Sequence, residues 1–479
     1  MSRSSLTTTQ HPLRIFIYTT LLVLGLASIL LAQSSLPTAP QLAWHDTEFY
    51  LFFHFGPNTF TNVEWGHGTE PEDVFNPTDL DCDQWCRIAK QAGARGIIIT
   101  AKHHDGFCLW PSWYSTHTVR ESAWRNGKGD VLRELSAACR RHGLKFGIYL
   151  SPWDRNHPQY GTPEYNDVYV NTLTELLTEY GELFEIWWDG ANGEGPNGKK
   201  QVYDFHRFER VAAQLQPNAV VFSDIGPGCR WVGNERGLIL TETNWCTLDT
   251  AGFQRGLGAP PNDTLNQGNA NGTQWIPAEC DVSIRPGWFY HAEEDDQMKT
   301  PEQLWAIYLH SVGRGANLIL NVPPDRRGHI AERDSASLVG FGEQMQRAFA
   351  KNLAQGKKVV TPFRVCLFTP KKYHSALLDG NRTTFDRFRR EVRHIEIDLG
   401  KKKTFNTVLL REATAQGQRV QAFSVEVFGK DGWQEISRST TIGPRKILQF
   451  PVQRSRKIRI RIQACKDVPL ISEVEVYKM

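Results

Sequence analysis

Between residues 45 and 350, short apolar runs alternate with stretches whose apolar residues recur at helical spacing. Short runs bounded by polar turns predict buried strands, and the stretches between them predict amphipathic helices. The predicted strands are 51–55, 96–101, 145–150, 184–188, 220–223 and 317–322, and the predicted helices are 80–93, 131–142, 168–180, 201–215 and 301–312. Strands that are each followed by a helix predict a parallel sheet covered by helices. At least six such units in about 300 residues favour a (β/α)8-like barrel over an open sheet.

The pattern changes after residue 356. Apolar and polar residues alternate strictly in 394–399, 424–427 and 457–462, with Gly/Asp turns between such runs. A period of two predicts strands that bury one face, so this part is expected to be an antiparallel β-sandwich. We therefore expect a catalytic barrel over 40–350 and a sandwich over 359–479.

The first 35 residues have the features of a secretory leader. Arginines precede an apolar run over 15–32, and a polar exit containing Pro37 follows it. Such a segment predicts export to a secreted or periplasmic location. The alternative is an uncleaved membrane anchor, because 18 apolar residues are at the lower limit for a span.

Composition and charge narrow the function. The 479 residues are 40% hydrophobic and rich in aromatics, which excludes a disordered chain. From Lys351 onward there are 27 Lys/Arg against 12 Asp/Glu, and the preceding part is correspondingly acidic, with 28 against 40. The acidic part favours a site that uses carboxylates. The basic residues of the tail alternate with apolar ones along strands, which does not indicate a nucleic-acid binder.

Polar residues directly follow several predicted strands, where a barrel carries its catalytic rim. They are His54, then Lys102, His103, His104 and Asp105, then Ser151 to Asp154, and then Asp189. Asp189 follows two tryptophans at a strand end, where a carboxylate is rigidly aimed and aromatic rings offer a sugar an apolar surface. Asp189 as a helix cap is the alternative interpretation.

The histidines leave three interpretations open. His54, His103 and His104 together with Asp105 are candidates for a divalent metal site, for a set of neutral donors that fix sugar hydroxyls, or for buried structural residues. Neighbouring residues on a strand point to opposite faces, which disfavours chelation of one ion by His103 and His104.

A glycosidase needs a second carboxylate, and spacing alone does not choose it. Glu235, Glu242, Glu279 and Glu293 all follow or separate predicted strands. An acid/base carboxyl is expected on a loop near apolar surface, which favours Glu235 beside Trp231. The residues alone thus predict an exported barrel enzyme that acts on sugars.

Several longer stretches carry a family resemblance. They are 54–61, 64–66, 100–107, 149–154, 188–190, 283–289 and 318–324. At these residues the chain resembles glycoside hydrolase family 29, the α-L-fucosidases. The resemblance implies a retaining exo-hydrolase that removes terminal α-L-fucose from fucosylated glycans without a metal or other cofactor.

The resemblance also implies roles for individual residues. Asp189 matches the family nucleophile, and the residues that match positions holding the sugar are His54, Glu64, Trp65, His103, His104, Tyr149, Trp288 and, near the ring oxygen, Arg230. Glu235 lies 46 residues after Asp189, as the acid/base does in the subfamily that acts on α-1,3/1,4-linked fucose.

The C-terminal part resembles discoidin-like (coagulation factor type C) modules at 378–385. It is expected either to pack on the barrel or to bind glycans or an anionic surface weakly. The alternatives for the whole chain are a non-catalytic glycan-binding protein and a glycosidase of other sugar specificity.

Overall fold

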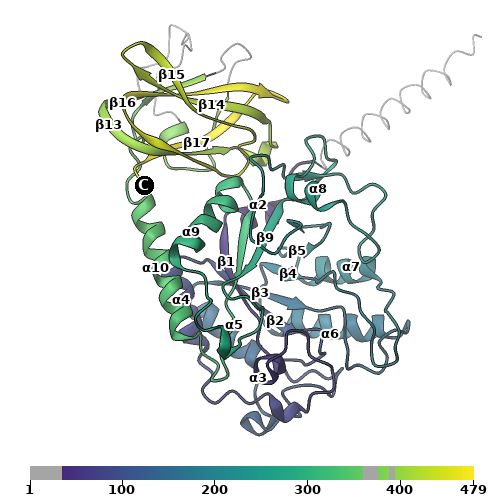
Figure 1. The fold of residues 1–479 in the computed structure, drawn as a ribbon. Helices are drawn as coiled ribbons and strands as arrows, with labels where there is room; N and C mark the ends of the chain where they lie inside the picture. Colours follow the sequence, from purple (N-terminus) through teal and green to yellow (C-terminus); the bar gives the residue numbers. More distant parts are fainter. Residues whose placement is uncertain (1–34, 360–375, 388–393) are drawn as a thin grey trace, which may run out of the picture.

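Eight parallel strands close into a barrel in the computed structural model, which describes residues 35–359, 376–387 and 394–479 (Figure 1). The strands are β1 (Phe49–Phe53), β2 (Gly96–Lys102), β3 (Lys145–Leu150), β4 (Glu185–Trp187), β5 (Val220–Ser223), β6 (Cys229–Trp231), β9 (Ala278–Ser283) and β10 (Asn317–Asn321). Their order around the barrel is β1-β10-β9-β6-β5-β4-β3-β2. The predicted fold class, a barrel followed by an antiparallel sandwich, is confirmed.

Helices surround the barrel (Figure 1). They are α2 (Ala39–His45), α3 (Pro57–Thr61), α4 (Cys82–Ala92), α5 (Val131–His142), α6 (Tyr165–Glu179), α7 (Phe205–Leu215), α8 (Asn262–Gln267), α9 (Pro301–His310) and α10 (Glu332–Phe349). Side chains at the N-caps fix where several of them begin. Asp81 accepts from the N–H of Gln84 at the start of α4, and Thr300 and Gln303 form a capping box on α9.

Two barrel strands were not predicted from the sequence. β6 has only three residues, and β9 carries Glu279 and Asp281 within it, so neither is an apolar run. A short two-stranded sheet, β7 (Thr247–Leu248) with β8 (Gln274–Trp275), lies in the connection between them. The polar loop expected around Arg230 therefore begins with a barrel strand.

Alternate residues of each strand point into the barrel. In β4, Ile186 packs in the cluster shared with the helices, whereas Trp187 packs in the inner cluster with Phe52, Tyr149 and Phe222. A strand's side chains alternate in direction, so the position two residues after Trp187 faces the same interior. That position is Asp189.

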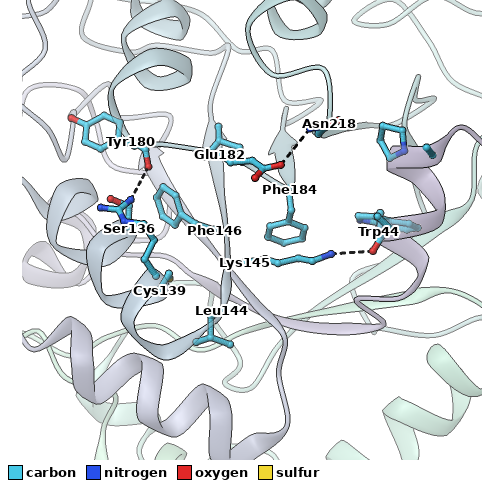
Figure 2. Close-up of a pocket in the computed structure, with 15 residues that line it drawn as sticks. Trp44, Ser136, Cys139, Leu144, Lys145, Phe146, Tyr180, Glu182, Phe184 and Asn218 are labelled. Carbon is cyan, nitrogen blue, oxygen red and sulfur yellow. Dashed lines mark hydrogen bonds between the residues drawn. The ribbon is translucent and has the colours of Figure 1, made fainter.

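The amino-terminal end of the barrel is closed by α2 and a polar network. The indole of Trp44 donates to Glu185 at 2.8 Å and to the Tyr50 hydroxyl at 3.1 Å. A cavity of about 580 Å³ lies beside α2 at this end, where Lys145 donates to the carbonyl of Ala43 at 3.0 Å (Figure 2). None of the predicted site residues lines this cavity.

The C-terminal domain is an antiparallel sheet wrapped around its own apolar core. Its strands are β11 (Lys358–Val359), β12 (Asp386–Arg387), β13 (His394–Glu412), β14 (Val420–Gly429), β15 (Gly432–Ser439), β16 (Lys446–Cys465) and β17 (Leu470–Tyr477). The core includes Ile395, Val425 and Ile460. The domain also packs on the barrel, because Leu409, Ile447 and Tyr477 join the barrel's outer apolar cluster.

The predicted leader lies almost wholly outside the described residues. Among the helices of the described part, none combines the length and apolar character that a membrane crossing requires.

Candidate active site

Asp189 is held by contacts to both of its carboxylate oxygens. Oδ1 accepts from the backbone N–H of Ala191 at 2.7 Å, and Oδ2 accepts from the Tyr149 hydroxyl at 3.1 Å. His104 Nε2 lies 3.8 Å from the same Oδ2. About a quarter of the side chain, 26%, stays exposed. The carboxylate is therefore fixed in direction and open to a ligand at the carboxyl end of β4.

Two of the predicted histidines have a fixed proton on Nδ1. His54 Nδ1 lies 2.9 Å from the side-chain amide oxygen Oδ1 of Asn321, which can only accept a hydrogen bond. His104 Nδ1 lies 2.8 Å from the Ser151 hydroxyl, which donates its own proton to the Trp153 carbonyl. Both imidazoles therefore carry their proton on Nδ1 and leave Nε2 as an acceptor.

The His103 ring contacts both of these rings, at centroid distances of 5.6 Å to His54 and 4.1 Å to His104. Its imidazole stacks on the Tyr149 ring at a centroid distance of 5.8 Å and an angle of 19°. Burial lowers the pKa of all three histidines, to about 3 for His54, so the rings are neutral at neutral pH. Neutral rings suit contacts with uncharged hydroxyl groups.

Glu64 and the aromatic residues form the wall of the site. Glu64 accepts from the backbone N–H groups of Trp288 at 2.8 Å and Phe289 at 3.2 Å, and it lies 2.6 Å from His291 Nε2. Trp65 next to it is 56% exposed and meets the His104 ring edge to face. The carboxylate of Glu64 thus joins the loop after β9 to the loop that carries Trp65.

Two further carboxyls face this end of the barrel and were not selected from the sequence. Burial and then the charge of Asp189 raise the pKa of Asp224 to about 6. Burial and then Glu235 raise the pKa of Asp281, which also accepts from the Trp231 indole at 2.9 Å. Asp224 directly follows the predicted strand 220–223, so the rule that selected Asp189 would have found it. Asp281 lies in β9, a strand that the sequence pattern did not predict.

Glu235 is exposed in a short turn after β6. Gly233 and Gly237 on either side adopt positive φ angles of 80° and 70°. Side chains other than glycine rarely adopt such angles, so these two residues define the ends of the turn. The turn follows β6, which pairs with β9 beside it, and the charge of Glu235 contributes to the raised pKa of Asp281 in β9.

The other glutamates considered from the sequence are engaged elsewhere. Glu242 pairs with Arg314 at 2.8 Å and Lys446 at 2.9 Å, and these cations help lower its pKa to about 2 against the effect of burial. Glu293 is exposed, and its hydrogen bond from Asn62 lowers its pKa. An acid that must be protonated near neutral pH needs a raised pKa, so both are poor candidates.

Glu279 does not lie on a loop as expected. It is fully buried within β9, where it accepts from the Trp187 indole at 2.8 Å and from the Tyr50 hydroxyl. Burial, and then the charge of Glu185, raise its pKa. Glu279 and Glu185 therefore lie together in the interior of the barrel below Trp187, as part of the core.

The positions of the potential ligands also test whether the three histidines and Asp105 form a metal site. Among the residues that the structure describes, the potential ligands that converge are Glu185, Cys229 and Glu279, in the barrel core. His54, His103, His104 and Asp105 do not form such a group. The geometry of the histidines fits hydroxyl binding.

Arg230 is not brought to the site. It is fully buried, and its Nε donates to the Leu265 carbonyl at 2.7 Å while Nη2 donates to the Trp245 carbonyl at 3.1 Å. Because Trp231 faces inward, its neighbour on the strand faces outward. These contacts give no support to the expected contact of Arg230 with the sugar, and its side chain instead holds the 244–276 connection.

Comparisons with known proteins identify the family. Residues 31–348 match the family description alpha-L-fucosidase, which spans the whole barrel. The chain belongs to the α-L-fucosidases. It is a glycoside hydrolase of family 29.

Similar fucosidases match along nearly the entire chain. Alpha-L-fucosidase 1 of Arabidopsis thaliana is 42% identical over 451 residues, which cover 92% of this chain and 87% of the plant protein. The GH29 fucosidase of Ruminococcus gnavus, solved in complex with fucose, has a TM-score of 0.83 and 31% identity, covering 93% of this chain and 95% of its own. The crystal structure of SpGH29 has a TM-score of 0.85 and 37% identity, and the match covers 93% of this chain and 99% of the SpGH29 chain. The likeness includes the C-terminal domain.

Proposed function

We propose that this fucosidase is a retaining exo-enzyme that hydrolyses terminal α-1,3/1,4-linked fucose, with Asp189 as nucleophile and Glu235 as acid/base. The observation that carries the proposal is the placement of Asp189, which is held at both oxygens and partly exposed at the barrel mouth. A nucleophile needs both features, because it must be aimed and must reach the anomeric carbon.

In the proposed reaction Asp189 attacks the anomeric carbon while Glu235 protonates the departing glycosidic oxygen. Glu235 then removes a proton from water, which attacks the fucosyl-enzyme and releases fucose. Retaining enzymes hold their two carboxyls about 5–5.5 Å apart. The short turn between Gly233 and Gly237 follows β6 as Asp189 follows β4, which supports placing both carboxyls at the carboxyl end of the barrel.

The histidines would hold the hydroxyls of the sugar. Nε2 of His54 and of His104 are acceptors, so each takes a hydrogen bond from a sugar hydroxyl. His104 Nε2 lies 3.8 Å from Asp189 Oδ2, so a sugar hydroxyl that donates to Nε2 would lie beside the nucleophile. Trp65 and Trp288 supply apolar surface for the methyl end of a 6-deoxy sugar.

Kinetics of single variants test the assignment of the two carboxyls. Asp189→Ala should abolish turnover. Glu235→Ala should lower kcat strongly on natural glycans, less on a nitrophenyl fucoside with its good leaving group, and azide should restore rate. Glu293→Gln serves as the matched control and should keep wild-type kcat. If Asp224→Asn shows the azide rescue and Glu235→Ala does not, Asp224 is the acid/base and the assignment of Glu235 is wrong.

A substrate panel tests the linkage. Hydrolysis of a Lewis-type trisaccharide without hydrolysis of 2'-fucosyllactose would support the α-1,3/1,4 preference, and the reverse would refute it. A chain that binds fucose but hydrolyses none of the substrates would be a glycan-binding protein.

We further propose that residues 1–35 export the enzyme and that the discoidin-like sandwich serves first to stabilise the barrel. The apolar residues that the sandwich contributes to the barrel's cluster support the second point. N-terminal sequencing of the exported protein distinguishes a cleaved leader from an anchor. Salt-sensitive retention of the purified full chain on an anionic glycan array would indicate that the sandwich also binds such surfaces.

A further inference from the structure

The three histidines of the site differ in one respect. Nδ1 of His54 and of His104 each lie within 2.9 Å of a neutral oxygen that fixes the proton on that atom. His103 Nδ1 is buried and has no hydrogen-bond partner. A buried polar atom without a partner is costly, so a group close enough to become its partner can determine the state of the ring.

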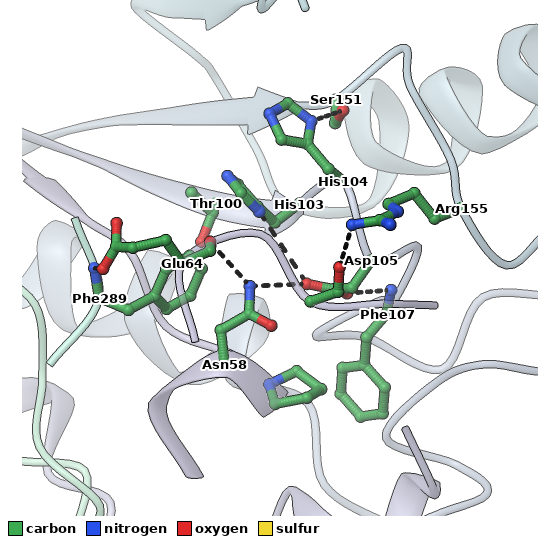
Figure 3. A network of polar contacts seen from close by, with 12 residues as sticks. Asn58, Glu64, Thr100, His103, His104, Asp105, Phe107, Ser151, Arg155 and Phe289 are labelled. Carbon is green, nitrogen blue, oxygen red and sulfur yellow. Dashed lines mark hydrogen bonds and ion pairs between the residues drawn. The ribbon is translucent and has the colours of Figure 1, made fainter. Parts of the chain in front are cut away.

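That group is the carboxylate of Asp105, whose Oδ2 lies 4.0 Å from His103 Nδ1 (Figure 3). Asp105 is 1% exposed. Its Oδ1 accepts from the backbone N–H of Phe107 at 2.7 Å, which holds the carboxylate in place. A distance of 4.0 Å is longer than a hydrogen bond, but such contacts often shorten when substrate binds.

Asn58 contacts the same carboxylate of Asp105 from another side. Its side-chain amide donates to Asp105 Oδ2 at 3.2 Å and to the Glu64 carbonyl at 3.3 Å. Asn58 Oδ1 is buried without a partner. Asp105 is thus linked on one side to His103 and on the other to the loop that carries Glu64 and Trp65.

We propose that Asp105 is a positioning residue that sets the tautomer of His103 and so decides whether His103 Nε2 accepts or donates a hydrogen bond to the sugar. This inference rests on the proposed role of His103 in binding the sugar. Asp105 itself does not touch the substrate.

The proton count gives two states. When Asp105 is ionised, it accepts from Nδ1–H, and Nε2 is an acceptor like those of His54 and His104. When the pair takes up one proton from solvent, the carboxyl donates to Nδ1, and the neutral ring carries its proton on Nε2 as a donor.

The surroundings place this change between pH 5 and pH 8. Burial raises the pKa of Asp105 to about 6, against the Phe107 N–H, which lowers it. Among the charged neighbours, His117 lowers the pKa, and Glu70 and Asp154 raise it. Asp105 is therefore ionised at pH 8 and protonated at pH 5, and His103 Nε2 is an acceptor at the higher pH and a donor at the lower.

Nitrogen NMR of the full chain labelled with 15N-histidine tests the inference directly. The His103 signals are assigned by their loss in His103→Gln. In the wild type we expect Nδ1 to be protonated at pH 8 and Nε2 at pH 5. In Asp105→Asn the amide donates to Nδ1, so Nε2 should be protonated at both values. An unchanged tautomer across pH 5–8 in the wild type would overturn the proposal, and this outcome does not depend on whether Asp105→Asn folds.

Kinetics supply the second readout. At pH 8, Asp105→Asn should raise KM about tenfold, the factor expected for one mismatched hydrogen bond, and kcat should change by less than about threefold. At pH 5 the variant and the wild type should have similar KM. Equal losses at both pH values, or a loss in kcat alone, would contradict the proposal.

The control is Asp325→Asn. Asp325 is 5% exposed and accepts from the N–H two residues on, at Arg327, as Asp105 does at Phe107. The Asp325→Asn variant should keep the wild-type dependence of KM on pH. If the wild type hydrolyses no fucoside, the proposed function fails while the tautomer measurement still stands. If only the tautomer result fails, the fucosidase assignment is untouched.

Discussion

At the scale of single residues, the barrel mouth concentrates carboxyls whose environments differ. Asp189 is fixed by Tyr149 and the Ala191 N–H, whereas Asp224 has a pKa raised to about 6 by burial and by Asp189. Two neighbouring acids with different environments are a common means of dividing the tasks of nucleophile and proton donor. With a pKa of about 6, Asp224 changes its charge between pH 5 and pH 7.5.

The charge of Asp224 predicts a pH effect on kcat. Above pH 6 the ionised carboxylate should stabilise the positive charge that develops on the sugar ring in the transition state. Asp224→Asn removes that charge, so kcat should fall about tenfold at pH 7.5 and stay near the wild-type value at pH 5. Steady-state kinetics across this range on a nitrophenyl fucoside check it. A kcat that falls equally at both pH values would contradict this role.

At the scale of elements, the strands determine which residues reach the site. Six barrel strands were predicted because each is an apolar run. β9 was missed because it directs Glu279 and Asp281 inward, and β6 was missed because it is only three residues long and contains the outward Arg230. Hydrophobic patterning finds a strand only where its inner face is apolar.

The same limit explains the errors in the site. Asp189, the histidines and Glu64 follow from the strand ends and the family motifs, so their positions could be predicted. The location of Glu279 and the direction of Arg230 could not, because both depend on the register of a strand that the pattern does not reveal. The partners that orient the site, such as Asn321 and His291, come from distant parts of the chain and leave no local signal.

The turn that carries Glu235 predicts an effect on the leaving group. Gly237 has a φ of 70°, and a Cβ there would lie 2.8 Å from Val282 Cγ1. Gly237→Ala should move the turn and lower kcat about tenfold on a Lewis-type trisaccharide but less on a nitrophenyl fucoside, whose leaving group needs little protonation. Gly252→Ala is the control, since Gly252 also has positive φ but open space around its Cα. Equal losses on both substrates would argue against an acid role for this turn.

The buried Arg230 predicts a loss of stability. Its guanidinium donates to carbonyls at Leu265, Ile276 and Trp245, and a lysine ammonium cannot reach all of them. Arg230→Lys should lower the free energy of unfolding by about 2 kcal/mol, because buried acceptors lose their donors. Chemical denaturation measures this. A variant of wild-type stability with a raised KM for fucose would instead support the original expectation of sugar contact.

At the scale of the whole molecule, the sandwich and the barrel share buried contacts. Gln418 of the sandwich side donates to the Asn244 carbonyl and accepts from the Cys246 N–H, each at 2.8 Å. Lys446 donates to the Glu242 carbonyl at 2.7 Å. These bonds fix the connection between β6 and β9. Arg230 also donates hydrogen bonds to carbonyls of this connection. The sandwich therefore supports the segment that follows the Glu235 turn.

A further link between the two domains is an ion cluster around Glu48, which precedes β1. Glu48 is 6% exposed and pairs with Arg411 at 2.8 Å and with Arg445, both of the sandwich and both buried. Arg382 lies 3.0 Å from the same carboxylate. Although burial opposes ionisation, the arginines outweigh it and hold the pKa of Glu48 well below its ordinary 4.5.

Glu48→Gln should destabilise the whole chain by about 3–5 kcal/mol, because it leaves Arg411 and Arg445 buried without a counter-charge. Since the folded-state pKa of Glu48 is lowered, its contribution is complete above the unfolded value of 4.5 and is lost as the pH falls below it. The stability gap between wild type and variant should therefore be constant from pH 6 to 8 and shrink below pH 4.5, which thermal and urea unfolding at several pH values will measure. Glu435→Gln, which breaks an exposed pair with Arg438, should change stability by less than about 0.5 kcal/mol. A Glu48→Gln variant as stable as this control at pH 7 would mean that apolar packing alone joins the sandwich to the barrel.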